Sequence, residues 1–113
     1  MDEKIIDWRG TSLEDVKVFP QDVKKEVGFE LNKVQHGHSP TNFKPVNRWG
    51  AGVIEIKIKG EDGEYRVVYV AKFAEAIYVL HAFNKKTQQT SPKDVKTISE
   101  RYKVVVEERR KLL

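Results

Sequence analysis

A predicted β-hairpin at residues 54–72 constrains the fold of this chain more than any other feature. The run IEIKIK at residues 54–59 alternates isoleucines with charged residues, so the isoleucines share one face of a strand while Lys57 and Lys59 share the other. The sequence GEDG that follows is a strong turn signal, and residues 65–72 are predicted to return as the second strand. The hairpin therefore presents one apolar face and one face that carries lysines.

Further segments extend this hairpin into a sheet. Residues 76–83 (AIYVLHAF) are apolar throughout, which is typical of a central strand covered on both faces. Lys4 to Trp8 is short and contains β-branched and aromatic residues, so we expect a first strand there. Residues 38–52 are rich in Pro, Gly and Asn and are predicted to form a loop. The sheet is thus expected to be an N-terminal strand plus an antiparallel meander of three strands.

Three helices complete the predicted fold. The segment Ser12–Asp15 resembles a capping box and begins a short helix that breaks near Pro20. Pro20 restarts a second helix, which ends at Gly37 and has one apolar face formed by Val23, Val27, Leu31 and Val34. Ser91 is a predicted N-cap of the last helix, whose apolar stripe comprises Val95, Ile98, Tyr102, Val105 and Leu112. Residues 1–113 are therefore predicted to form a single α+β domain, with a helical hairpin and a C-terminal helix packed on the sheet.

The charge of the chain is distributed unevenly. Residues 85–113 contain nine Lys or Arg against four Asp or Glu, whereas residues 1–84 contain twelve against thirteen. This asymmetry favours a nucleic-acid partner. The chain has no cysteine, which excludes disulfides and thiolate metal sites and suits a reducing compartment. No signal-peptide pattern and no apolar run of about 20 residues is present, so we expect a cytoplasmic protein that does not bind or span a membrane.

The candidate site is a set of cations near the strand ends, namely Lys57, Lys59, Arg66, Lys85 and Lys86. Lys57 and Lys59 are expected about 7 Å apart, which suits adjacent phosphates, although a solvated strand face explains them equally well. Arg66 either pairs with a carboxylate such as Glu55 or grips a phosphate at two points. Clustered cations lower one another's pKa, which can leave one lysine able to accept a proton. A solvated pair at a strand end is the plainer interpretation of Lys85 and Lys86.

Other residues that could carry chemistry are interpreted as structural. His81 lies in the most apolar strand, where a histidine is usually a hydrogen-bonded core residue. The sequence HGH at residues 36–38 has too few neighbouring ligands for a metal site, so neither a metal nor a cofactor is predicted. No glycine-rich phosphate loop or nucleophile elbow is present. Four aromatic residues could stack on bases, but core and loop packing explains most of them: Trp8, Trp49, Phe73 and Tyr78.

Several segments together resemble the phage-associated, HigB-like branch of the RelE/ParE toxin superfamily. The strongest similarity lies in AGVIEI at residues 51–56, YRVVYVAKF at 65–73 and VLHAFNKKTQ at 79–88. Shorter segments add to it, namely FPQDV at residues 19–23, FKP at 43–45 and Arg101-Tyr102. The resemblance covers nearly the whole chain, and it implies the RelE-like fold, which agrees with the predicted order of elements.

The resemblance also implies a function. It implies a type II toxin that cuts messenger RNA, usually on the translating ribosome, and that is neutralised by a HigA-like helix-turn-helix antitoxin. In RNA-cleaving relatives, a metal-free cluster of basic residues activates the ribose 2′-hydroxyl. By resemblance, Arg66 contacts the scissile phosphate and one of Lys57 and Lys59 is the general base. Lys85 or Lys86 would protonate the leaving group or stabilise charge, in positions where some relatives have an arginine.

Two other functions fit the same resemblance. One is a noncatalytic inhibitor of DNA gyrase, of the kind that ParE-like members represent. The other is an inactive remnant that binds only RNA or its antitoxin. The sequence leaves the oligomeric state, the codon preference and the identity of the antitoxin open.

Overall fold

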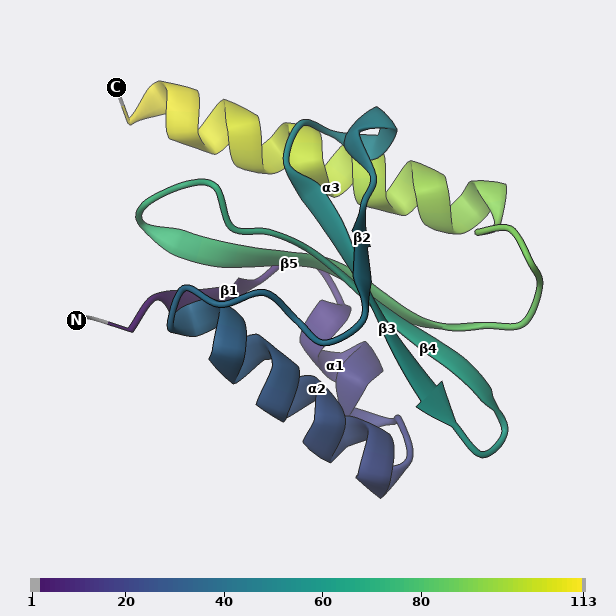
Figure 1. Cartoon of the computed structure of the whole chain (residues 1–113). Coiled ribbons are helices and arrows are strands. Elements are labelled where there is room, and N and C mark those ends of the chain that lie inside the picture. Colours follow the sequence, from purple (N-terminus) through teal and green to yellow (C-terminus); the bar gives the residue numbers. More distant parts are fainter. Residues whose placement is uncertain (1–2, 113) are drawn as a thin grey trace.

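A five-stranded mixed sheet forms the middle layer of the fold, between helices on its two faces (Figure 1). In the computed structural model, which describes residues 3–112, the elements follow in this order: β1 (Ile5–Trp8), α1 (Ser12–Lys17), α2 (Gln21–Gln35), β2 (Phe43–Pro45), the 3-10 turn η1 (Asn47–Trp49), β3 (Val53–Gly60), β4 (Gly63–Val70), β5 (Ala76–Lys85) and α3 (Pro92–Lys111). The strand order is β1-β5-β4-β3-β2, with β1 parallel to β5 and the other pairs antiparallel. The predicted α+β class, first strand, meander and terminal helix are confirmed.

The strand β2 lies where the sequence predicts a loop. It pairs antiparallel with β3, which sets Lys44 opposite Glu55, and the backbone N–H of Lys57 also donates to the carbonyl of Asn42 (2.8 Å). All three residues of β2 are exposed, so no alternation of apolar and polar residues marks the strand. The prediction of a loop over residues 38–52 is therefore wrong at β2 and η1. Backbone hydrogen bonds, rather than side-chain burial, form this edge strand.

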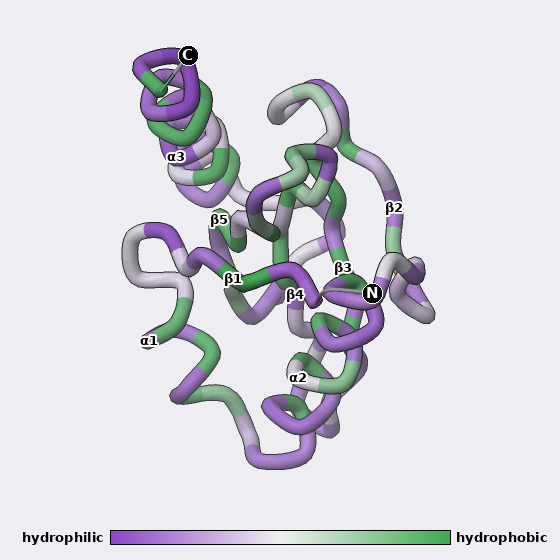
Figure 2. The backbone as a smooth tube through the Cα atoms, turned by 90° about the vertical axis from the view of Figure 1, so that its left-hand side faces the viewer, coloured by the Kyte–Doolittle hydropathy of each residue, from purple (hydrophilic) through white to green (hydrophobic). Residues whose placement is uncertain are grey.

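Each face of the sheet has its own hydrophobic core. On one face, α1 and α2 pack on the strands, and the four predicted apolar positions of α2 are all buried. On the other face, α3 packs through Ile98 and Val105. Figure 2 shows α2 and α3 on opposite sides of the strands, with hydrophobic residues along much of the strands and mainly hydrophilic residues along the two helices. Leu112 departs from the predicted stripe of α3, because it is 85% exposed. None of the described helices combines the length and the apolar character that crossing a membrane requires.

The central hairpin forms as predicted. Gly60 pairs with Gly63 across a two-residue turn, so β3 and β4 stay in register along their whole length. The next strand, β5, extends two residues beyond the predicted end, which makes Lys85 part of the strand rather than of the connection after it. A bulge in β5 opposite Val68 and Tyr69 leaves one extra residue in that strand. An unbroken apolar run such as residues 76–83 gives no sign of such a bulge.

Of the two predicted helix caps, the one at α3 forms and the one at α1 does not. Ser91 caps α3, since its hydroxyl accepts a hydrogen bond from the backbone N–H of Asp94 (3.1 Å). The capping box at α1 is not formed, because the Ser12 hydroxyl is buried and donates to the carbonyl of Val79 instead (3.2 Å). The hydroxyl of Thr11, the N-cap residue, donates to the Asp15 carboxylate (2.9 Å). At α1, a contact with β5 has therefore replaced a local cap.

An ion pair between Arg109 and Glu75 connects the second half of α3 to the segment between β4 and β5. Arg109 donates to the Glu75 carboxylate, and the Tyr78 hydroxyl donates to the same carboxylate (2.8 Å). These two contacts, with Arg109 first, lower the pKa of Glu75 to about 2 from its ordinary 4.5. Because the pKa is lowered in the folded state, the stabilisation is present above pH 4.5 and is lost as the pH falls towards 2.

We expect the Glu75→Gln variant to unfold at a lower temperature than the wild type above pH 4.5 and at nearly the same temperature near pH 2. The reason is that acid neutralises the carboxylate in the wild type, so the two proteins converge. Thermal unfolding followed by circular dichroism at a series of pH values measures this difference. A gap between the two midpoints that stays constant over the whole range would contradict the ion-pair assignment.

Candidate functional site

Cations from three neighbouring strands meet on the side of the sheet that α3 covers. The register sets Lys57 of β3 opposite Arg66 of β4, and Glu64 of β4 opposite Lys85 of β5. Opposite residues in a strand pair share one face, and here that face is continued by core residues packed on α3. The sheet therefore brings Lys57, Arg66 and Lys85 together. We call these three residues and Lys44 of β2 the basic cluster.

Arg66 is the centre of the basic cluster and is buried. Its side chain is only 4% exposed, although the sequence left open whether it pairs with a carboxylate or faces a ligand. The structure places it between two carboxylates: its Nη2 donates to Glu64 Oε1 (2.6 Å), and its Nε lies 3.7 Å from Glu55 Oε2. Glu64 is exposed, whereas Glu55 lies beneath the surface. The guanidinium is thus held in place under the site by the two carboxylates.

The buried carboxylate of Glu55 depends on Arg66. Glu55 is 0% exposed, and neither of its oxygens contacts a hydrogen-bond donor within the described part of the chain. The guanidinium of Arg66 is the cation that lies within ion-pair distance of it. An isolated carboxylate in such a position would be very costly. The pair therefore holds the middle of β3 and β4 together.

The surroundings of Lys85 affect its pKa. It is half-buried at the end of β5, where burial and then the positive charge of Arg66 lower its pKa below the ordinary 10.5. The neighbouring Lys44 lowers this pKa as well, while Glu55 and Glu64 oppose the shift. A lysine with a lowered pKa transfers its proton more readily near neutral pH. The position of Lys85 beside Arg66 and its lowered pKa together make it a candidate proton donor.

The five predicted site residues do not all come together. Lys57 is half-buried beside Arg66, and Lys85 lies within the electrostatic influence of Arg66. Lys59 is exposed near the hairpin turn, where its register partner is Glu64. Lys86 is also exposed and lines a shallow cavity with Lys85 that contains the carboxylates of Asp62 and Glu64. Lys59 and Lys86 thus lie at the margin of the site, and their catalytic roles remain predictions.

Two cations at the site were not predicted as site residues from the sequence. Lys44 reaches Lys85 because β2 pairs with β3, and Arg48 lies on η1, directly after β2. Both residues line a cavity of about 410 Å³ together with Lys85. Each lies in the segment predicted to be a loop, where a lone lysine or arginine has no distinguishing pattern. The resemblance of the FKP segment at residues 43–45 to the toxin superfamily is the one signal in the sequence that points to this region.

His81 has the structural partners expected of a core histidine. Its Nε2 lies 2.7 Å from Asp94 Oδ1, and its ring stacks on Phe83. Arg101 approaches the other ring nitrogen at 3.5 Å and donates to the carbonyl of Leu80 (2.9 Å). These contacts connect β5 to α3. Over residues 3–112, the His, Asp and Glu side chains form no group of three or more that could coordinate a metal ion.

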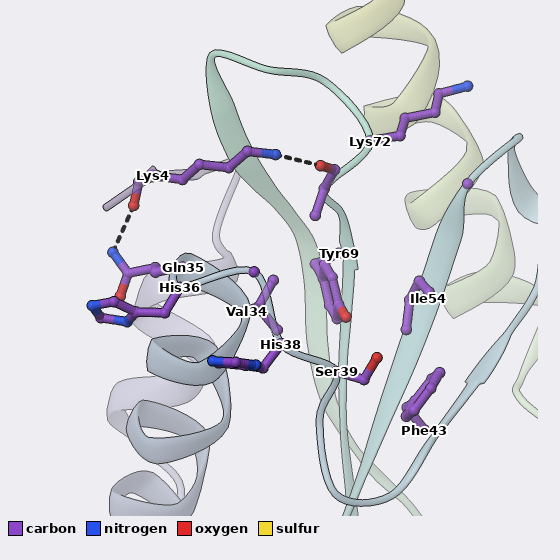
Figure 3. A pocket seen from close by; sticks show the side chains of 13 residues that line it. Lys4, Val34, Gln35, His36, His38, Ser39, Phe43, Ile54, Tyr69 and Lys72 are labelled. Atoms are coloured by element: carbon purple, nitrogen blue, oxygen red, sulfur yellow. Dashed lines mark hydrogen bonds between the residues drawn. The ribbon is translucent and has the colours of Figure 1, made fainter. Parts of the chain in front are cut away.

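A larger cavity, of about 760 Å³, lies away from the basic cluster (Figure 3). It separates the C-terminal end of α2 from β2 and β3, and apolar side chains such as Val34 and Ile54 form much of its lining. Two lysines line it, Lys4 and Lys72, and Lys4 donates to the backbone carbonyls of Ala71 (2.6 Å) and Phe73 (2.9 Å). Burial raises the pKa of Tyr69, another lining residue, to about 12. The hydroxyl of Tyr69 therefore stays protonated near neutral pH, and the ammonium group of Lys4 is occupied by backbone carbonyls.

Comparisons with known proteins agree with the fold. The profile of a family described as phage-derived, Gp49-like proteins matches residues 14–103. No curated protein sequence gives a significant match. Among solved structures, the chain is similar to the toxin RelE of E. coli, in a free form described as a mutant in which two arginines are replaced by alanine. The TM-score is 0.63 at 16% identity, over 93% of this chain and 99% of that one. The RelE-like fold is thereby confirmed.

Proposed function

Because the chain belongs to the family of phage-derived, Gp49-like proteins, we propose that it is the toxin of a type II toxin–antitoxin system and cleaves messenger RNA without a metal ion. The similarity to a structure described as a toxin supports this proposal. The observation that carries it is the basic cluster, in which three lysines lie on the same face of the sheet as the buried guanidinium of Arg66. Such an arrangement attracts a polyanion and stabilises charge that develops on a phosphate.

In the proposed reaction, the ribose 2′-oxygen attacks the neighbouring phosphorus while the bond from phosphorus to the 5′-oxygen breaks. Lys57 accepts the proton of the 2′-hydroxyl, and Lys85 donates a proton to the leaving 5′-oxygen. Arg66 and Lys44 supply positive charge that stabilises the doubly charged phosphorane. The products are a 2′,3′-cyclic phosphate and a 5′-hydroxyl. Lys57 is preferred to Lys59 as the base because it lies beside Arg66, whereas Lys59 is exposed beyond it.

The proposal includes two macromolecular partners. The substrate is messenger RNA on the translating ribosome, whose ribosomal RNA adds further negative charge for the basic cluster to contact. The inhibitor is a HigA-like antitoxin with a helix-turn-helix DNA-binding domain. Because translating ribosomes lie in the cytoplasm, we propose that the protein acts there.

A cell-free translation reaction tests the proposed activity. We expect primer extension on a reporter message to reveal new 5′ ends with the wild type and at least a hundredfold fewer with Lys57→Ala, because general acid–base groups contribute about 10² to 10⁴ in rate. Lys25→Ala is the matched control, since Lys25 is an exposed lysine of α2 on the opposite side of the sheet. A reaction with purified message and no ribosomes measures whether cleavage requires translation.

Each outcome of this assay has a clear meaning. Intact messages in the presence of the wild-type protein would overturn the ribonuclease proposal, and supercoiling by DNA gyrase would then be assayed as the alternative target. Equal cleavage by Lys57→Ala and the wild type would leave the activity standing but remove Lys57 from the reaction.

A further inference from the structure

We infer that the cavity between β2, η1 and the segment after β5 binds one nucleotide of single-stranded RNA, with its base stacked on Arg48 and its phosphate held by Lys44 and Lys85. The inference rests on the proposed function for the class of substrate. It adds a pocket for a base beside the reacting groups, with which it shares Lys44 and Lys85, and it assigns a role to Arg48, which the proposed reaction does not use.

The charge of this cavity distinguishes it from its neighbours. Its volume of about 410 Å³ falls within the range of small-ligand pockets, roughly 300–1,000 Å³. Three cations line it, and no Asp or Glu is among the described residues of its wall. The adjacent cavity around His81 contains Asp15 and Asp94, and the one around Lys86 contains Asp62 and Glu64. The cavity at Arg48 therefore suits an anionic group better than these two cavities do. The larger cavity beside Val34 also lacks Asp and Glu, but its lining is mostly apolar and its Lys4 already donates to backbone carbonyls.

A stacked pair of side chains forms one wall. The Cζ atom of Arg48 lies 5.4 Å from the centre of the Trp49 ring, and Arg48 is exposed while Trp49 is only 3% exposed. The buried ring thus lies beneath the guanidinium, and the exposure of Arg48 leaves the guanidinium accessible to a base. Guanidinium planes and aromatic rings are the surfaces on which unpaired RNA bases stack. The indole N–H of Trp49 is buried without a hydrogen-bond acceptor in the described residues, which leaves a donor in this wall.

The turn that carries Arg48 is fixed in position. The Tyr102 hydroxyl of α3 donates to the carbonyl of Ala51 (2.8 Å), and the Asn47 side chain accepts from the backbone N–H of Gly52 (3.1 Å). Gly50 has φ +151°, and a Cβ atom there would lie 2.6 Å from the Tyr102 ring. Only glycine therefore allows this close contact with α3. Such a rigid turn presents Arg48 at little entropic cost.

Other residues of the cavity can form hydrogen bonds with the edge of a base and contact its phosphate. Gln88 and Gln89 are exposed on the connection between β5 and α3, and their amides offer both donors and acceptors to a base edge. Lys44 and Lys85 supply the charge for the phosphate. Lys85 also belongs to the basic cluster, so a nucleotide in this cavity would lie next to the scissile phosphate. A base reaches such a pocket only when it is unpaired, which favours single-stranded RNA over a duplex.

The probe for this site is a fluorescein-labelled RNA tetranucleotide that carries 2′-O-methyl groups on every ribose and cannot be cleaved by 2′-hydroxyl attack. We expect Arg48→Ala and Arg48→Lys each to weaken its binding about tenfold in fluorescence anisotropy, because stacking requires the planar guanidinium and not only its charge. Arg110→Ala is the control of equal charge, since Arg110 is an exposed arginine near the end of α3. In a Trp8→Phe background, we also expect the RNA to change the fluorescence of Trp49.

An abasic form of the same tetranucleotide separates stacking from charge. It should bind wild type and Arg48→Lys equally, because the phosphate contacts of Lys44 and Lys85 are unchanged. Wild-type affinity of Arg48→Lys for the tetranucleotide that carries bases would overturn the inference, and so would equal affinity of the wild type for a duplex of the same sequence. If messages stay intact but the tetranucleotide binds through Arg48, the nucleotide site stands and the ribonuclease proposal falls. If messages are cleaved but Arg48 does not affect binding, the ribonuclease proposal stands and the nucleotide site falls.

Discussion

Replacing Arg66 by alanine is expected to lower the free energy of unfolding by about 3–5 kcal/mol, which is the cost of leaving one member of a buried ion pair without its partner. In this variant, the carboxylate of Glu55 would remain at 0% exposure with no cation beside it. Chemical denaturation measures the effect as a lower midpoint with an unchanged slope. A midpoint like that of the wild type would contradict the assigned ion pair.

A double variant separates the structural role of Arg66 from any role in cleavage. Glu55→Leu with Arg66→Met removes both charges and keeps the side-chain volumes similar, so we expect most of the lost stability to return. Glu55→Leu alone is the matched control, because it leaves Arg66 with Glu64 as a partner. Loss of RNA cleavage in Arg66→Ala cannot by itself assign this residue to the phosphate, because unfolding would produce the same loss. Cleavage is therefore to be compared only among variants that denature at similar midpoints.

Lys85→Met is expected to reduce RNA cleavage about 10² to 10⁴-fold, the usual contribution of a group that transfers a proton in the rate-limiting step. Lys85 is half-buried near the surface and makes no ion pair within 4.0 Å among the described residues, so its loss should leave the fold intact. Single-turnover cleavage of a fixed message measures the rate. Lys103→Met, at an exposed position of α3, is the control.

The pH dependence of the same reaction tests whether Lys85 is the proposed acid. The acid must be protonated, so the rate falls as the pH rises through the pKa of Lys85, and this fall lies below pH 10.5 because burial and Arg66 lower the pKa. Lys85→Arg keeps the charge but stays protonated, so we expect this alkaline fall to disappear while part of the charge stabilisation is retained. An unchanged alkaline limb in Lys85→Arg would mean that another group donates the proton.

The parts of the fold that the sequence predicted well are those whose signals are local. The alternation of isoleucines in β3, the GEDG turn and the apolar face of α2 each depend on residues a few positions apart. The strand β2 was missed for the opposite reason, because its three exposed residues carry no periodicity and its pairing with β3 is made by the backbone. The capping box at α1 was a false local signal, since Ser12 is occupied by the carbonyl of Val79 in a distant strand.

The sequence by itself determined the α+β class, the order of most elements and the presence of cations on one face of a hairpin, because side-chain periodicity specifies which residues face the same way. Only the tertiary structure decided which cations act together. Burial of Glu55 made Arg66 an internal partner rather than a freely exposed group, and the pairing of β2 with β3 brought Lys44 and Arg48 to Lys85. These outcomes depend on desolvation and on distances between segments far apart in the chain, which no local pattern encodes.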